Sequence, residues 1–481
     1  MMSAVYVVTI DTARDGSYTA DITADVLRLA WRLGFEAPGD SLAGPSRAQI
    51  TVRGLTGQYA PEHPASALQS GLRARIQAIH NGTTHTLFSG WIAHVEPQPG
   101  ELGPRTAIIH LEGGERFLRH VRVRLPPQVQ VRAGDVVAAV LDFAPGLARD
   151  LEPGLTPLTY AADTWADGIS ALDALRQMAA TDRGRFFIDR QARAVFHNRH
   201  HTLLDQTVRA VFIDDMDGLR YIYGDGRASR VRVTLRPRAV MAAGLVLWRV
   251  PNAQTVPGGT QREIVARFSD DRGQPAGALT VTAPRPHIDY TANTRHDGTG
   301  DDITDQVSVT LHQIDFSAAV LRLHNPLPLM AYMQPGMQLT GMPVYGGDLI
   351  TLEYTDCAVE TLYGPRVVDF DLPALDSIEE ADNLARFELA RRRQPRGAVR
   401  SLSVSGRAHL AQVLARTLFD RIAVMESQTG HSDDYFIIAE DHIVEQGGHD
   451  HRVTWTLEPA EPAIFWLVGH HRLNRETVLA Y

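Results

Sequence analysis

Alternation of hydrophobic and polar residues is the clearest pattern along the first quarter of the chain. Ala48, Ile50 and Val52 alternate with polar neighbours, which is the period of a strand with one buried face. The same alternation returns over residues 74–78, and Asn81-Gly82 then supplies the two residues of a type I′ turn before residues 84–88 run back. Regular short strands of this kind predict a small β-barrel or sandwich. The strands expected over residues 1–125 are Val5–Ile10, Val26–Trp31, Ala48–Val52, Ala74–Ala78, Thr84–Phe88, Trp91–Val95 and Thr106–Leu111.

From residue 126 the apolar period lengthens toward that of a helix. Asp135–Phe143 and, more strongly, Asp167–Ala180 carry apolar residues on one stripe. Phe186–Asp189 and Ala194–His197 follow as a predicted hairpin. Residues 126–226 are therefore expected to form an inserted α+β domain.

Strand patterns return beyond residue 226 and are interrupted by one long predicted helix, Ser377–Arg393. Ser377 and Glu380 form a capping box at its start, and Pro395 follows its end. The predicted fold class is mainly β with an α+β insert, in several tube-like β-barrel or sandwich domains. The expected units are 1–125 (first β-domain), 126–226 (α+β insert), 227–400 (second β-domain with the helix), 401–463 (C-terminal β-unit) and 464–481 (docking tail).

A short segment occurs twice. Asp21-Ile22-Thr23 with Val26 recurs as Asp302-Ile303-Thr304 with Val307, and a strand start follows each copy at Ser46 and at Ser317. The repeat predicts two similar β-domains in one chain.

The composition excludes several classes of mechanism and of binding site, but it does not indicate a particular function. The 481 residues carry a mild net charge of −9, and all 47 basic residues are arginine. Mechanisms that need a lysine ammonium are therefore excluded. The single cysteine, Cys357, excludes intrachain disulfides and thiolate clusters, and its apolar setting predicts a packed thiol. With neither a signal-peptide pattern nor an apolar run long enough for a membrane helix, we expect a soluble protein that is not exported and makes no stable membrane insertion.

Three patterns resemble catalytic or metal-binding motifs, and we predict no catalytic, cofactor-binding or metal residues from them. Gly39-Asp40-Ser41-Leu42 has the letters of GDSL esterases, but no Asp in the chain has a His three residues later. The histidine groups lack a carboxylate at matching spacing and are interpreted as surface or interface histidines; they are His197-x-x-His200-His201, His449-x-His451 and His470-His471. The aspartates from Asp297 to Asp305 lack the order of an EF-hand, so a solvated turn is the favoured interpretation for them.

The order of several segments resembles the tail hub, or minor tail, proteins of long-tailed bacteriophages and prophages. The segments are IDTARDGSYTADITADV, PSRAQITVRGLTGQYAPEHPASAL, GLRARIQAIHNGTTHTLFSGWIAHVEP, WADGISALDALRQMAATDRGRFFIDRQARAVFH, SIEEADNLARFELARRRQPR and WLVGHHRLNRETVLAY. The resemblance implies a homotrimeric, non-enzymatic protein of the virion tail tip, made in the bacterial cytoplasm. It implies two tube-like barrels per chain, so that three chains match a six-fold tube. The implied role is to close the tube, anchor tip or fibre proteins and open for the passage of genomic DNA. The implied partners are further copies of the chain, the distal tail or tube protein and the tape-measure protein.

Two alternatives stay open beside the hub. One is a hexameric distal tail adaptor, or the equivalent ring of a phage-derived injection device. The other is a virion-borne esterase or glycosidase that uses Ser41 or paired carboxylates.

The last segment is rich in apolar residues with no evident element to bury them. We predict that it docks on a neighbouring chain or a partner, through Phe465, Trp466, Leu467, Leu473, Val478, Leu479 and Tyr481.

Overall fold

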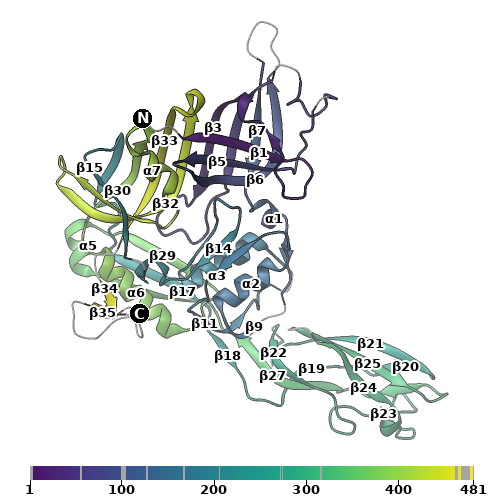
Figure 1. Cartoon of the computed structure of the whole chain (residues 1–481). Helices are drawn as coiled ribbons and strands as arrows, with labels where there is room; N and C mark the ends of the chain where they lie inside the picture. The colour runs from purple at the N-terminus through teal and green to yellow at the C-terminus, as the bar shows by residue number, and fades with distance from the viewer. Residues whose placement is uncertain are drawn as a thin grey trace.

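The computed structural model of the chain has one large sheet, with a central α+β region below it and a long β-arm that extends away (Figure 1). It describes residues 4–54, 57–64, 66–98, 105–125, 128–165, 168–204, 206–270, 272–273, 275–314, 317–460, 464–466 and 477–479. The predicted fold class, mainly β with an α+β insert, is confirmed.

The large sheet has 13 strands and is built from both ends of the chain. Its first half comprises β1 (Val5–Asp11), β2 (Ala20–Asp21), β3 (Val26–Gly34), β4 (Arg47–Arg53), β5 (Arg73–His80), β6 (Thr83–Gln98) and β7 (Thr106–Glu112). Its second half comprises β15 (Val208–Ile213), β16 (Gly218–Tyr223), β30 (Gly397–Ser405), β31 (Arg421–Glu426), β32 (His431–Glu445) and β33 (Asp450–Pro459). Each half has its own buried apolar cluster, around Ile50 and Ile76 in the first and around Phe212 and Trp455 in the second. Helix α7 (Gly406–Ala415) packs on β30 and β33.

The two halves meet where β3 pairs with β32, from Leu29 opposite Val444 to Gly34 opposite Ala439. Gly34 has a φ of 106°, and a Cβ atom there would lie 2.2 Å from the carbonyl oxygen of Ile438. Only glycine allows this close approach of the two backbones. We call this line of contact the seam.

Hydrogen bonds between buried polar residues connect the seam to the central region. Arg190, in the turn between β13 (Arg185–Ile188) and β14 (Ala194–His197), donates to both carboxylate oxygens of the fully buried Glu440 at 2.7 and 2.6 Å. It also donates to the carbonyl oxygens of Leu414 and Arg416. Burial raises the pKa of Glu440, but the guanidinium of Arg190 and the imidazole of His442 together lower it more, to about 2. The carboxylate therefore stays charged and paired inside the sheet.

Two buried histidines continue this network along the seam. Nδ1 of His442 lies 2.8 Å from Nε2 of His451, whose Nδ1 lies 2.6 Å from the hydroxyl of Tyr6. The ring of Trp31 stacks on His442 with centroids 4.6 Å apart. Tyr6 and Trp31 belong to the first half of the sheet and the histidines to the second, so the network bridges them.

The central region holds the predicted helices and hairpin. Its elements are α1 (Arg116–Arg119), β8 (Arg122–Val123), β9 (Gln128–Arg132), α2 (Ala133–Leu141), β10 (Arg149–Leu151), β11 (Pro157–Ala161), β12 (Ile169–Ser170), α3 (Ala171–Asp182), β13, β14 and α4 (His201–Leu204). Beside it lie β17 (Arg230–Leu235), β28 (Ile350–Thr355), α5 (Cys357–Tyr363), β29 (Val367–Leu372) and α6 (Ile378–Arg392). Helix α6 starts as predicted, with the Ser377 hydroxyl accepting from the Glu380 amide at 3.2 Å, and it packs on β17.

The arm contains its own core around Leu321 and Leu339. Its strands are β18 (Arg238–Val240), β19 (Leu245–Arg249), β20 (Gln254–Val256), β21 (Thr260–Arg267), β22 (Gly277–Thr282), β23 (Ala292–Asn293), β24 (Ser308–Ile314), β25 (Ala318–Asn325), β26 (Ala331–Met333) and β27 (Gln338–Gly346).

The sheet does not follow the predicted division of the chain. Strands β15 and β16 lie inside the predicted 126–226 insert, yet they pair with β31 and β30 of the large sheet. The predicted unit 401–463 is not separate, because it pairs with β3. The predicted second β-domain, 227–400, is divided between the arm and the β17–α6 unit. The alternation of apolar and polar residues shows that a segment is a strand, but it does not show which distant strand the segment pairs with. The predicted domain boundaries were wrong for this reason. For the same reason β6, predicted as two strands, is one.

Both copies of the Asp-Ile-Thr segment fold into the same turn. The side chain of Asp21 accepts from the Thr23 amide at 2.8 Å, and Asp302 accepts from the Thr304 amide at 2.9 Å. Each threonine hydroxyl then accepts from a backbone amide of an earlier strand, that of Val8 or that of Ala292. A 3-10 turn and a strand follow in both places, but β3 belongs to the large sheet and β24 to the arm. The repeat is real at the level of this turn, and the two copies sit in different sheets.

Candidate metal centre

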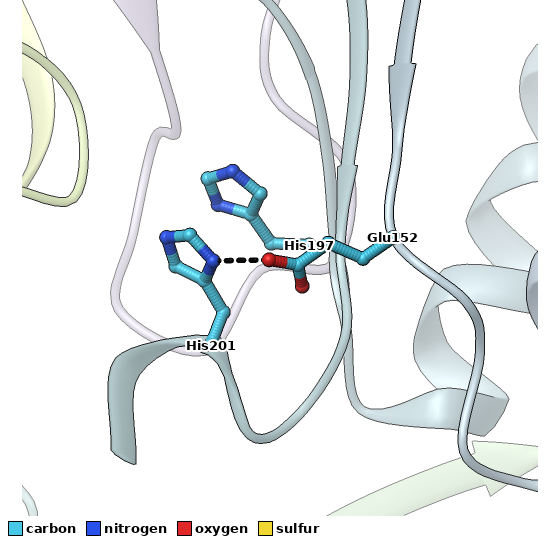
Figure 2. Close-up of side chains that lie close together, drawn as sticks. All are labelled: Glu152, His197 and His201. Atoms are coloured by element: carbon cyan, nitrogen blue, oxygen red, sulfur yellow. Dashed lines mark hydrogen bonds and ion pairs between the residues drawn. The ribbon is translucent and has the colours of Figure 1, made fainter. Parts of the chain in front are cut away.

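Three side chains that could ligate a metal converge in the central region: Glu152, His197 and His201 (Figure 2). Strands β10 and β14 are parallel neighbours, with Leu151 opposite Phe196. The residues that follow this pair, Glu152 and His197, therefore lie at the same edge. A tight turn then brings His201, the first residue of α4, back over His197.

The carboxylate of Glu152 holds this turn in place. One oxygen lies 2.6 Å from Nδ1 of His201, and the other accepts from the backbone amide of Asn198 at 2.8 Å. The Asn198 side chain accepts from the His200 amide at 2.9 Å, which closes the turn. Glu152 and His201 are both half-buried. One donor atom from each of Glu152, His197 and His201 lies within 4.8 Å of the other two.

The two imidazoles lie face to face. Their centroids are 3.4 Å apart and their planes differ by 12°. Phe187 and Phe419 pack edge-on to the ring of His197, with centroids 5.1 and 5.2 Å away. Nδ1 of His197 is buried and has no hydrogen-bond partner in the described part of the chain. A buried nitrogen in this condition keeps its lone pair available to a ligand.

Electrostatics keep one histidine neutral and the carboxylate charged. Burial, together with the nearby His201, lowers the pKa of His197 to about 3. Burial raises the pKa of Glu152, but the hydrogen bonds from His201 and Asn198 lower it more, so that it ends below its ordinary value. A neutral imidazole and a carboxylate are the forms in which these side chains ligate metals.

A cavity of about 140 Å³ opens beside the two histidines. Phe387, Phe419 and Phe436 form part of its wall, and five arginines line the rest. Each arginine is paired with a carboxylate: Arg183 and Arg391 with Glu388, Arg185 with Glu458, Arg199 with Glu380, and Arg421 with Asp434. Glu388 is shared by Arg183, Arg391 and Arg392, so the carboxylates compensate the positive charge of the cavity wall only in part.

The sequence did not reveal this cluster. The interpretation as surface or interface histidines without a matching carboxylate does not hold for His197 and His201, which are half-buried, because strand pairing brings in Glu152 from 45 and 49 residues upstream. The available signal was a histidine at the end of the predicted strand Ala194–His197, whereas the short strand that precedes Glu152, β10, was not predicted. His451 is also not at the surface, since it lies in the seam.

The remaining candidates are placed as follows. Ser41 donates to the backbone carbonyl oxygen of Arg176 at 3.5 Å and lines a separate cleft of about 720 Å³, whose described lining residues include eight arginines and no histidine. The side chain of Asp297 accepts from the amide of Thr299, as in a solvated turn. Cys357 is exposed at the start of α5, so the prediction of a packed thiol is wrong.

The predicted docking tail is described only in part. Phe465 and Trp466 lie in β34 (Ile464–Trp466), which pairs in parallel with Val478 and Leu479 of β35 (Thr477–Leu479). Leu467, Leu473 and Tyr481 lie outside the described residues. Docking of this segment stays a prediction. None of the helices in the described ranges is long and apolar enough to cross a membrane.

No family model and no curated protein matches the sequence. Among solved structures, the chain is similar to the 43 kDa tail protein of prophage MuSo2 from Shewanella oneidensis, with 10% identity, coverage of 95% of this chain and 99% of that one, and a TM-score of 0.48. It is similar to a tail protein from Neisseria meningitidis, with 11% identity, coverage of 94% and 97%, and a TM-score of 0.49. It is also similar to prophage tail protein gp18 from Listeria monocytogenes, with 10% identity, coverage of 95% of each chain, and a TM-score of 0.41. At these scores the role of the chain has to be argued from its own residues and geometry.

Proposed function

We propose that this chain is a structural virion protein, the tail hub at the distal end of a phage tail tube, and that it acts as a homotrimer without enzymatic activity. The order of its sequence segments, from IDTARDGSYTADITADV to WLVGHHRLNRETVLAY, supports this proposal through its resemblance to hub proteins.

The seam is the observation that carries the proposal. It makes one chain contribute two β-modules side by side, each with its own core, in a single sheet. Three copies would present six such modules around a ring, which matches the symmetry of a six-fold tube. The sheet path ends at β2 on one side and at β16 on the other, so among the described strands the two ends differ. Contacts between unlike ends are head-to-tail, and such contacts close into rings.

The remaining parts suit attachment. In this proposal the ring closes the tube against the distal tail or tube protein and the tape-measure protein, and it opens for the passage of genomic DNA. The arm extends away from the sheet and offers a separate surface for tip or fibre proteins (Figure 1). The tail from Ile464 onward docks on a neighbouring copy or a partner.

Counting subunits tests the proposal. Native mass spectrometry of the full chain, and cryo-electron microscopy of assembled tails, should both give three copies per ring. Six copies would instead favour the distal adaptor or the ring of an injection device. A monomer in solution that is also absent from tails would overturn both ideas. Ester hydrolysis that disappears in Ser41→Ala would overturn the absence of enzymatic activity.

A further inference from the structure

We propose that Glu152, His197 and His201 bind one divalent first-row transition-metal ion, with Zn²⁺ as the representative ion. This inference is independent of the hub proposal.

The first argument for this proposal is the set of metal-ligating groups. Two imidazoles and one carboxylate are a set that zinc accepts in proteins, with bonds of about 2.0–2.2 Å and a fourth position open to another ligand. The three donor atoms already lie within 4.8 Å of one another, on side chains that point toward one another from three elements (Figure 2). Ligands on a tetrahedral ion lie about 3.3 Å apart at those bond lengths, so the most distant donors need to close by at most about 1.5 Å, and the Glu152–His201 contact of 2.6 Å has to open by about 0.7 Å.

The second argument for this proposal is the ring nitrogen of His197 that has no hydrogen-bond partner among the described residues. Nδ1 is buried without a hydrogen bond among the described residues, a condition that costs free energy unless a partner arrives. A metal ion supplies that partner. Because the nitrogen stands beside the Glu152–His201 pair, a single ion reaches all three groups.

The turn permits the rearrangement that binding needs. A metal ion lies in the plane of each imidazole that binds it, whereas the two rings are now stacked. The ring of His201 therefore has to rotate about its side-chain bonds. Its Nδ1 exchanges the contact with Glu152 for a bond to the ion, and in the neutral imidazole the single proton resides on Nε2. Glu152 keeps its second oxygen on the Asn198 amide, so the carboxylate stays aimed during the change.

The surroundings provide the fourth ligand. Both histidines line the 140 Å³ cavity, which is large enough to admit a water molecule or a small anion to the ion. The paired arginines on its far wall favour an anion at that position more than a second cation.

The chain offers a matched control. His94 and His110 also stack, with centroids 4.1 Å apart, and Nε2 of His110 lies 3.5 Å from a carboxylate oxygen of Glu96. That group sits on the large sheet and does not bring three donor atoms together as the central cluster does. Replacing His110 therefore removes a histidine of a similar pair without touching the proposed site.

The experiment is metal titration of the full chain after treatment with a chelator. Zn²⁺ binding is measured by calorimetry and by competition with a chromophoric chelator, and Co²⁺ is used as a spectroscopic probe. We expect one Zn²⁺ per chain. His197→Ala, His201→Ala and Glu152→Gln should each weaken binding by at least about tenfold, the lower end of what even the loss of an outer-shell partner costs. His110→Ala should leave the affinity unchanged.

Two results would overturn the proposal. One is a wild-type chain that binds no Zn²⁺ and shows no visible Co²⁺ absorption. The other is tight binding that survives in folded Glu152→Gln and His201→Ala, which would place the ion elsewhere. Glu152→Gln retains an acceptor for the Asn198 amide, so it keeps the test decisive if a histidine variant does not fold.

Discussion

Two of the histidine pairs in the described part of the chain lie beside a glutamate in very different surroundings. In the seam, His442 and His451 are fully buried, share a hydrogen bond and are covered by Trp31 and Tyr6. In the central region, His197 and His201 are half-buried, stack without a hydrogen bond between them and open onto a cavity. Residue type is the same in both places, so the difference lies in burial and in access from the cavity.

The consequence concerns what each pair can still bind. In the seam, three of the four imidazole nitrogens of His442 and His451 are hydrogen-bonded. The fourth, Nε2 of His442, has no hydrogen-bond partner among the described residues, but it is fully enclosed and lies 3.6 Å from Glu440, whose two oxygens are both bound by Arg190. In the central pair, Nδ1 of His197 also lacks a partner among the described residues, and there a cavity lies beside the two histidines. Enclosed polar networks stabilise and orient packed elements. A set beside a cavity can accept a ligand, and the following predictions test this contrast.

We expect the largest loss of stability when Arg190 is replaced. Replacing it by methionine leaves Glu440 charged and unpaired inside the sheet, and breaking a buried pair in this way costs about 3–5 kcal/mol. We expect Arg190→Met to lower the free energy of unfolding by that amount in guanidinium denaturation followed by tryptophan fluorescence. Trp31 and Trp455, both in the large sheet, report on the transition.

Two further variants check the cause of that loss. Arg190→Met combined with Glu440→Gln should recover part of the stability, because it removes the unpaired charge. Arg176→Met, which removes an exposed pair with Asp173, should change it by less than about 0.5 kcal/mol. Equal losses at Arg190 and Arg176 would contradict a special role for the seam.

The second effect is a dependence of stability on pH. Burial lowers the pKa of both His442 and His451, although Glu440 opposes the shift at His442. The unfolded chain therefore takes up protons below about pH 6.5 more readily than the folded seam does. A histidine that stays neutral in the folded chain costs up to about 1.4 kcal/mol of unfolding free energy per pH unit in that range, and His451, whose pKa is lowered well below its ordinary value, should show this slope most fully.

The measurement is the free energy of unfolding between pH 7 and pH 5. That window lies above the range in which Glu440 contributes to the slope, because its stabilisation is lost only as the pH falls from the pKa of an unfolded glutamate, about 4.3, to the folded value of about 2. His451→Gln should reduce the slope by the equivalent of one proton. An unchanged slope would show that the seam histidines do not titrate as described.

A smaller effect is expected at Tyr6. Tyr6→Phe keeps the ring but leaves Nδ1 of His451 without its partner 2.6 Å away. Loss of one partner of a buried group costs about 1–3 kcal/mol. A loss near zero in the same denaturation experiment would mean that the hydroxyl does not contribute to closing the network.

Local features of the fold followed from the sequence because their causes are local. The Asn81-Gly82 turn was predicted from residue preference, and both residues have positive φ, 49° and 76°. The start of α6 was predicted from Ser377 and Glu380, which are three residues apart. The turn formed by Asp-Ile-Thr is made twice by the same few side-chain oxygens.

Features that depend on distant partners did not follow. The pairing of Leu29 with Val444 joins residues more than 400 positions apart, and neither strand's pattern identifies the other. Glu152 escaped notice for the same reason, because parallel pairing of β10 with β14 brings it to His201. Sequence spacing showed that the two histidines are neighbours along the chain but could not reveal their carboxylate.

We expect the smallest loss of stability when His201 is replaced, and this replacement also contrasts most strongly with those in the seam. Its pair with Glu152 is partly open to solvent, with side chains 30% and 32% exposed, and such pairs contribute about 0–1 kcal/mol. In metal-free protein, His201→Ala should therefore change the free energy of unfolding by no more than about 1 kcal/mol.

With Zn²⁺ at a hundred times its dissociation constant, the free energy of unfolding of the wild type should rise by about 2.7 kcal/mol and that of the variant should not change. Repeating both measurements on Tyr6→Phe separates the two clusters, because that variant should lose stability without metal and still gain the full increment with Zn²⁺. If Zn²⁺ stabilised His201→Ala as much as the wild type, the central pair would be as closed to ligands as the pair in the seam.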